Sequence, residues 1–373
     1  MKILILGGYG NFGARICRAL ASDPDIELLV AGRDAGKASD LTRELGPRAT
    51  ALALDLRTAE LAGQFAALGV NLVIHAAGPF QEQGYGVAMA AAEARAHYLD
   101  LADGRRFVCD FPSALDTAFR HAGRTGISGA STVPALSSAV IDALCVGWKR
   151  IHNIDICIAP AQTAPRGDAT LAGVLSYCGE EVTVWLEGRW QTRRGWAHLH
   201  RERFARLRSR LGALCDIPDL ELFPSLYGVR DRVMFRAAVE VGMSQRILAL
   251  MAALRAAKLI PQPARWASAL NRAGQIFNAF GSRLGGMVVR VSGCDGDGRD
   301  TTAAWHIAAD DDHGPEIPCM AAILLARRLA RGAALPVGAF TAARYLTLQD
   351  FAPEFARWGM RTDKEEGGAD ATE

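Results

Sequence analysis

The sequence lacks a long apolar run, an excess of charge of either sign and any closely paired cysteines. No uninterrupted apolar stretch among its 373 residues approaches the roughly 18 needed to span a membrane. The formal net charge is only +2, so we expect no nucleic acid partner. None of the eight cysteines belongs to a Cys-x-x-Cys pair. We therefore expect buried free thiols, with no disulfides and no metal site.

The first residues also lack the basic and apolar segments of a secretory signal, because a strand is predicted from the second residue on. A cytoplasmic protein is the expectation that follows. The length is sufficient for two domains, each with its own core.

What the chain does have is a glycine-rich turn at its start. The apolar residues 2–6 run into Gly7-Gly8-Tyr9-Gly10-Asn11-Phe12-Gly13, and a helix is predicted to follow. Gly-x-Gly-x-x-Gly between a strand and a helix is typical of dinucleotide binding, because glycines admit the pyrophosphate and the helix N-terminus attracts it. A purely structural glycine turn is the alternative. The predicted cofactor ligands in this turn are Gly8, Gly10, Asn11, Phe12 and Gly13.

The end of the second predicted strand, residues 26–31, indicates which dinucleotide is bound. An acidic residue is typical there when NAD is the cofactor, because it binds the ribose hydroxyls. Here Gly32 and Arg33 stand at the strand end, and an arginine can pair with a 2′-phosphate. We therefore predict NADP, with Arg33 as the phosphate ligand and Lys37 as its helper. Asp34 leaves NAD open as the less favoured alternative, and Asp55, after the third strand, joins the predicted cofactor residues.

Short apolar strands alternate with helices over the first third of the chain. This pattern predicts an α/β fold of the Rossmann type, a doubly wound parallel sheet. From Ile151 on, longer strands and a predicted hairpin around Asp295-Gly296-Asp297-Gly298 indicate a second, α+β domain with a mixed or antiparallel sheet. We expect a dinucleotide-binding domain over 1–134, rejoined by a segment near 315–355. The second domain, for substrate and dimerisation, would cover 135–314, and the polar tail 361–373 would be disordered.

Several further segments carry a family resemblance. They are Ala31-Gly32-Arg33, Ala76-Ala77-Gly78-Pro79-Phe80, His97-Tyr98-Leu99-Asp100-Leu101, Arg166-Gly167-Asp168-Ala169-Thr170 and Asp312-His313-Gly314-Pro315. With the glycine-rich turn, the chain resembles the saccharopine dehydrogenase-like family of NADP-binding oxidoreductases to about Phe340. The resemblance implies an NADP-dependent enzyme, and the family includes saccharopine reductases, other amine-forming reductases and enoyl reductases of lipid assembly. In one departure, Asp103-Gly104 stands where many members carry Gly-Glu.

The remaining candidate residues follow from these segments. Ala77, Gly78 and Pro79 would pass over the cofactor at the end of the fourth strand, unless they form a simple turn. Tyr98 and Asp100 share one face of the fifth strand, and a carboxylate there could act as an acid or merely bracket a loop. Arg166 could bind a substrate carboxylate, or be a surface charge. His313 could transfer protons, although a loop histidine is the simpler interpretation. The predicted catalytic residues are Asp100, Tyr98, Arg166 and His313.

We therefore expect hydride transfer to or from an imine or an activated carbon–carbon double bond of a small acidic or acyl substrate. A short-chain dehydrogenase is disfavoured, because no Tyr-x-x-x-Lys pair occurs. The alternatives are a non-catalytic NADP(H)-binding sensor or scaffold, and a lipid-directed enoyl reductase. The latter depends on the arginine-rich run 189–210, otherwise a solvated helix face, and on the amphipathic run 243–280, otherwise a lid, dimer surface or core. A homodimer is expected, and membrane-surface contact is not.

Overall fold

The computed structural model of the chain describes residues 1–165 and 167–368. The chain divides into two compact units. Unit 1 comprises Met1–Leu136 and Pro315–Leu346, and unit 2 comprises Ser137–Gly314 and the chain from Thr347 on. Among the described residues, no helix is both long enough and apolar enough to cross a membrane.

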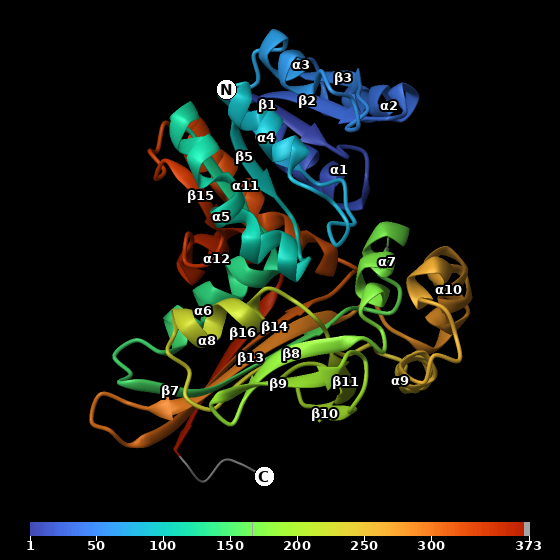
Figure 1. Cartoon of the computed structure of the whole chain (residues 1–373), viewed down its shortest axis with the longest axis vertical. Coiled ribbons are helices and arrows are strands. Elements are labelled where there is room, and N and C mark those ends of the chain that lie inside the picture. The colour runs from blue at the N-terminus through green and yellow to red at the C-terminus, as the bar shows by residue number, and fades with distance from the viewer. Residues whose placement is uncertain (166, 369–373) are drawn as a thin grey trace. The chain divides into compact units, whose positions relative to one another are not determined.

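Unit 1 contains a seven-stranded parallel sheet with the order β15-β6-β5-β4-β1-β2-β3, in which the central strands are buried (Figure 1). The strands are β1 (Lys2–Leu6), β2 (Glu27–Gly32), β3 (Ala49–Ala53), β4 (Leu72–His75), β5 (His97–Asp100), β6 (Thr125–Ser128) and β15 (Gly338–Thr341). The helices are α1 (Asn11–Leu20), α2 (Ala35–Leu45), α3 (Leu61–Ala67), α4 (Gly86–Glu93), α5 (Arg105–Ala122), η1 (Thr132–Leu136) and α11 (Ile317–Ala330). This strand order is that of the Rossmann fold, so the predicted architecture of the first domain is confirmed.

Helix α5 is longer than the sequence suggests. The sequence predicts a helix over 112–122, but α5 begins seven residues earlier, at Arg105. Pro112 therefore lies inside the helix, where it removes one backbone hydrogen bond. The helix persists because Phe107, Phe111, Leu115 and Phe119, spaced four residues apart, form a buried stripe against the sheet.

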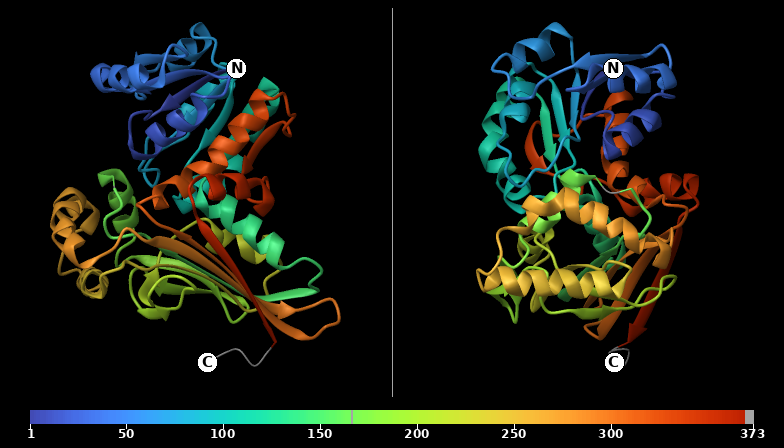
Figure 2. Two further views of the ribbon diagram at one scale, coloured as in Figure 1. Left: turned by 180° about the vertical axis from the view of Figure 1, so that it is seen from behind. Right: turned by 90° about the vertical axis from the view of Figure 1, so that its right-hand side faces the viewer.

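Unit 2 contains a mixed nine-stranded sheet, as predicted. Its main path is β10-β11-β12-β7-β13-β14-β16, in which only the β12–β7 pair is parallel, while β8 and β9 branch from β12 (Figures 1 and 2). The strands are β7 (Arg150–Ala159), β8 (Glu181–Leu186), β9 (Arg189–Arg194), β10 (His200–Glu202), β11 (Arg210–Leu214), β12 (Arg232–Ala237), β13 (Gly285–Cys294), β14 (Asp300–Ala309) and β16 (Arg361–Gly368). The α-helices are α6 (Ser137–Leu144), α7 (Asp168–Ser176), α8 (Asp219–Leu226), α9 (Gly242–Ala256), α10 (Ala267–Gly274) and α12 (Leu348–Arg357). Short 3₁₀ segments are η2 (Pro263–Trp266) and η3 (Gln275–Phe280), and a third, η4 (Gly314–Glu316), lies where the chain passes back to unit 1.

Two predictions about the C-terminal region are wrong. The segment returning to unit 1 ends at Leu346, so α12, which begins at Leu348, belongs to unit 2. The disorder predicted for 361–373 does not hold for 361–368, which form β16 and pair with the edge strand β14. Backbone pairing needs no apolar side chains, which is why a polar sequence can complete a sheet edge. Residues 369–373 lie outside the described residues.

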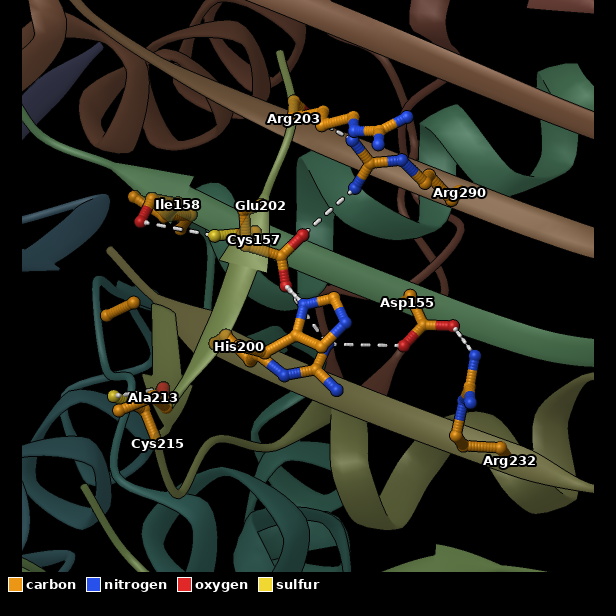
Figure 3. A network of polar contacts seen from close by, with 12 residues as sticks. Asp155, Cys157, Ile158, His200, Glu202, Arg203, Ala213, Cys215, Arg232 and Arg290 are labelled. Atoms are coloured by element: carbon orange, nitrogen blue, oxygen red, sulfur yellow. Dashed lines mark hydrogen bonds and ion pairs between the residues drawn. The ribbon is translucent and has the colours of Figure 1, made fainter. Parts of the chain in front are cut away.

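Charged side chains of unit 2 are paired across its sheet (Figure 3). The buried carboxylate of Glu202 accepts hydrogen bonds from Arg236 and Arg290, each 3.1 Å away. Asp155 accepts from Arg232 at 2.5 Å and from Arg236 at 3.3 Å. These carboxylates offset the guanidinium charges, which would be costly to bury alone.

The arginine-rich run 189–210 is not a helix face. It forms β9, β10 and β11, and several of its arginines are in ion pairs. Arg194 pairs with Glu181, Arg206 with Asp363 and Arg210 with Glu240. Because much of its charge is already paired, this run is a poor anionic-ligand surface.

Candidate functional site

The glycine-rich turn joins β1 to α1 in unit 1. The backbone N–H groups of Gly7 and Gly8 both donate to the carbonyl of Ala31, and each hydrogen bond is 3.0 Å long. These two hydrogen bonds hold the turn against β2. A Cβ on Gly13 would lie 2.1 Å from the Gly7 carbonyl oxygen, so only glycine lets α1 begin this close to the strand. Helix α1 begins at Asn11, directly after Gly10. The N-terminus of a helix placed here attracts an anion.

Tyr9 covers the end of β2, a role that the sequence analysis missed. A Cβ on Gly32 would lie 2.3 Å from the Tyr9 ring, so glycine is needed there. The Tyr9 hydroxyl accepts a hydrogen bond from the Asp34 N–H at 2.9 Å. The Asp34 carboxylate in turn accepts from the Lys37 N–H at 3.1 Å and caps α2. Arg33 lies between Gly32 and Asp34 in the sequence, and its side chain is exposed. The only signal in the sequence was a tyrosine inside the turn and a glycine at the next strand end.

Asp55 lies just beyond β3 and close to this corner. Hydrogen bonds from Arg57 lower the pKa of Asp55, and the Arg33 charge adds to the effect. Asp55 is exposed and bound by Arg57 at 2.9 Å. The predicted cofactor residues Arg33 and Asp55 therefore lie near each other at the carboxyl ends of β2 and β3.

The turn after β4 lies against the glycine-rich turn. Atoms of Ala77 come within 3.1 Å of the position that a Cβ on Gly7 would occupy. The Gln83 amide donates to the carbonyls of Ala77 and Pro79, at 2.8 and 2.7 Å, and these hydrogen bonds hold the turn in place. A Cβ on Gly78 would meet nothing closer than 3.5 Å. The fold itself therefore does not require glycine at 78, whereas a ligand approaching the backbone would.

Tyr98 and Asp100 form part of a buried polar array at the ends of β4 and β5. The Tyr98 hydroxyl lies 3.1 Å from Nδ1 of His75. One carboxylate oxygen of Asp100 accepts from the N–H groups of Ala102 and Gly129 and from the Ser128 hydroxyl, over 2.8–3.0 Å. Asp100 thus holds the backbone that follows β5 and β6 in place. This is the structural role that the sequence analysis gives as the alternative to catalysis.

Burial governs protonation in this array. Burial raises the pKa of Asp100 to about 6, although hydrogen bonds from four neighbouring residues favour its ionised form, and burial lowers the pKa of His75 to about 4. His75 is therefore neutral near pH 7. The Tyr98 side chain has no exposed surface, and burial raises its pKa. Its hydroxyl therefore contacts neighbouring side chains and not solvent.

Asp103 is the more accessible carboxyl at the end of β5. Its side chain is half-buried, and one of its oxygens accepts from the Gln81 amide at 3.1 Å. Burial raises the pKa of Asp103. Through Gln81 this carboxyl is linked to the loop that follows Gly78 and Pro79.

The other predicted residues are distributed over both units. Asn11 and Phe12 occupy the first turn of α1, and the Phe12 carbonyl accepts from the Cys319 thiol at 3.6 Å. His313 belongs to unit 2, where its ring contacts that of Trp358 with centroids 4.9 Å apart. Arg166 lies outside the described residues.

Asp219, in unit 2, is a titratable group that sequence reasoning missed. It is fully buried at the start of α8, and the Ser137 hydroxyl donates to it at 2.6 Å. Burial raises the pKa of Asp219 to about 8, so its carboxyl is largely protonated near neutral pH. The local sequence gave no signal, because the burial comes from packing between distant segments.

One group of side chains in unit 2 has the composition of a metal site. Ligand atoms of His152, Cys294 and Asp300 all lie within 4.8 Å of one another. The Cys294 sulfur is 3.5 Å from His152 Nε2 and 3.5 Å from an Asp300 oxygen. Hydrogen bonds of the Cys294 thiol account for these distances.

The comparisons with known proteins agree with the geometry of unit 1. Residues 3–127 match the model of the saccharopine dehydrogenase NADP-binding domain. This part of the chain is similar to that domain. The match confirms the predicted resemblance and NADP as the cofactor, and a dehydrogenase domain of this kind supports an oxidoreductase.

Solved structures extend the similarity of fold to both units. A saccharopine dehydrogenase (L-Glu forming) from Saccharomyces cerevisiae is 13% identical, with a TM-score of 0.69, covering 98% of this chain and 100% of that chain. A homospermidine synthase from Legionella pneumophila, solved with NAD, is 10% identical, with a TM-score of 0.62, covering 98% and 91%. At these identities the likeness concerns the fold alone. No curated protein sequence matches the chain.

The residues of unit 1 fit NADP. The turn at Gly7–Gly13 and the first turn of α1 would hold the pyrophosphate, and Gly78 leaves room for close approach. Because Asp34 is engaged in capping α2, the exposed Arg33 is the side chain suited to a 2′-phosphate.

Proposed function

We propose that the protein is an NADP-dependent reductase that transfers hydride to an imine of a small acidic substrate. An activated carbon–carbon double bond of an acyl substrate is the second acceptor that the same site would accommodate. NADPH supplies the hydride when it is bound. Reduction of an imine also adds one proton to nitrogen, so the site needs a group that can donate a proton.

The observation that carries this proposal is the half-buried carboxyl of Asp103. It lies just after the carboxyl end of β5, where ligands bind in parallel α/β sheets, and burial raises its pKa. The Gln81 amide orients it at 3.1 Å. We assign Asp103 as the proton donor to the substrate nitrogen. We assign Asp100 and Tyr98 positioning roles, because both are fully buried.

The two structural neighbours favour the imine over the carbon–carbon double bond. They are named for saccharopine and homospermidine, both secondary amines, and hydride addition to an imine produces an amine. This support is by analogy of fold only.

The test is NADPH consumption with a panel of acceptors. The panel pairs 2-oxo acids or aldehydes with amines, and includes an enoyl thioester. We expect turnover with imine-forming pairs. Asp103→Asn should lower kcat by about 100-fold or more while leaving NADPH affinity unchanged. Asp110→Asn, on the exposed face of α5, is the matched control.

Two results would contradict the proposal. Tight NADPH binding without turnover on any acceptor would favour the non-catalytic sensor or scaffold. Full activity of Asp103→Asn would remove Asp103 as the proton donor but leave the reductase assignment in place.

A further inference from the structure

Helix α9 buries a polar side chain and exposes several large apolar ones. Its Gln245 is fully buried, accepts from the Val239 N–H at 3.1 Å and donates to the Ala237 carbonyl at 3.4 Å. By contrast, Met243, Ile247 and Leu250 are 57%, 42% and 58% exposed. Their spacing of i, i+4 and i+7 places them on one stripe of the helix, where a surface helix normally carries polar residues.

The exposed apolar side chains continue into the segments after α9. Leu259, Trp266, Ile276 and Phe280 are all exposed, the last two more than 70%. Of the 13 large hydrophobic side chains exposed among the described residues, seven lie within 243–280, about a tenth of the chain. We call this the 243–280 surface. In Figure 2 its helices, α9 and α10, lie together in gold. Such a concentration marks an interaction site.

The charged residues of the segment that carries this surface are all positive, and the exposed Asp168 of α7 contacts it through Ser268 and Asn271. Between Glu240 and Asp295 the sequence contains no acidic residue, but six arginines and one lysine. Arg255, Arg283 and Arg290 are in ion pairs with acidic residues from other segments. Arg246, Lys258 and Arg265 are exposed, and within the described part of the chain they form no ion pair. The 243–280 surface therefore combines exposed apolar side chains with free cations.

We propose that the 243–280 surface docks on a membrane that contains anionic lipids. A second copy of the chain is a poor occupant, because a symmetric contact would place cations against cations. A bilayer with anionic head groups offers negative charge and hydrocarbon together, which matches both features. At 15 residues α9 is about 22 Å long, too short to cross the ~30 Å hydrocarbon core, so it lies in the interface plane. This inference does not depend on the proposed reaction.

The experiment is vesicle co-sedimentation of the full chain. One set of vesicles contains phosphatidylcholine alone, and the other adds phosphatidylglycerol. We expect binding only to the anionic vesicles, weakening as salt is raised. The double variant Ile276→Ser/Phe280→Ser and the double variant Lys258→Ala/Arg265→Ala should each weaken binding at least about tenfold.

The matched control is Val146→Ser, since Val146 is 79% exposed but lies outside the surface. Thermal unfolding and NADPH binding of every variant are measured first, so that a loss of binding cannot reflect misfolding. No binding to anionic vesicles overturns the proposal, as does binding that both double variants retain. Self-association that Ile276→Ser/Phe280→Ser abolishes, without vesicle binding, would assign the surface to a second copy. Salt-sensitive capture of an acidic protein, again without vesicle binding, would assign it to that protein.

Discussion

The hydroxyl of Tyr9 accepts a hydrogen bond from the backbone N–H of Asp34, 2.9 Å away. This contact joins the glycine-rich turn to the end of β2 while the Asp34 carboxylate caps α2. The acidic side chain at this strand end, that of Asp34, is therefore engaged in capping a helix, and Arg33 is exposed beside it. The arrangement explains physically why this corner suits NADP better than NAD.

Arg33→Ala should therefore weaken NADPH binding by about 10- to 100-fold, the effect of losing a charge-assisted hydrogen-bonded pair, and leave NADH binding nearly unchanged. Fluorescence titration with both cofactors measures this. Arg43→Ala, an exposed arginine on helix α2, which follows Arg33, controls for loss of positive charge. Unchanged NADPH affinity in Arg33→Ala would show that the 2′-phosphate lies elsewhere.

Gly13→Ala tests the close packing of α1 on the turn. The new Cβ would lie 2.1 Å from the Gly7 carbonyl oxygen and 2.9 Å from the Gly8 Cα, so the turn must open. We expect a loss of about 1–3 kcal/mol in the free energy of unfolding, and weaker NADPH binding. Gly63→Ala in α3 is the control, because a Cβ there meets nothing within 4 Å and should stabilise the helix by roughly 0.5–1 kcal/mol. Urea unfolding compares the two, and equal stabilities would contradict the steric argument.

The sequence predicts best what depends on neighbouring residues. The β1–turn–α1 unit was foreseen because its signal lies in one short segment, and the parallel sheet because strand and helix patterns alternate. The contact of Tyr9 with Gly32 depends on the register between the turn and β2, which no local pattern encodes. The same holds for Asp100, which accepts hydrogen bonds from Ala102 and from Ser128 and Gly129 at the end of β6.

Two other misses have different physical causes. Asp219 looked like an ordinary acidic residue at a helix start, and its burial follows only from tertiary packing. The exposure of apolar side chains on α9 could not be predicted, because an amphipathic pattern does not say which side of a helix faces the protein. From the sequence, the run 243–280 is compatible with lipid contact, a lid, a dimer surface or core, and nothing in it predicts a buried glutamine.

Asp219 should make stability depend on pH. Its folded-state pKa is raised from 3.8 to about 8, so between these values the folded state binds more protons than the unfolded state. Its contribution is therefore complete below about pH 4 and is lost as the pH rises toward 8. Asp219→Asn removes this titration, and the variant should lose less stability than wild type between pH 5.5 and pH 8.

Thermal unfolding midpoints at the two pH values measure this difference. Asp297→Asn, at an exposed position in the β13–β14 turn, is the control and should follow wild type. If Asp219→Asn and wild type lose the same stability over this range, Asp219 is already ionised in the folded protein. The measurement also separates Asp219 from His75, whose lowered pKa acts in the opposite sense, stabilising as the pH rises from about 4 to 6.5.

Strand β16 should be a required part of unit 2 and not a removable tail. Its eight residues pair with β14, and the Asp363 carboxylate binds the Arg206 guanidinium through two hydrogen bonds, 2.6 and 2.7 Å long. A chain ending at Met360 leaves β14 as an unprotected sheet edge, so we expect lower stability and aggregation. At roughly 2–4 °C per kcal/mol, the thermal midpoint should fall by several degrees. A chain ending at Gly368 keeps every one of these pairs and is the matched control, so equal midpoints for the two truncations would mean that β16 adds nothing to the sheet.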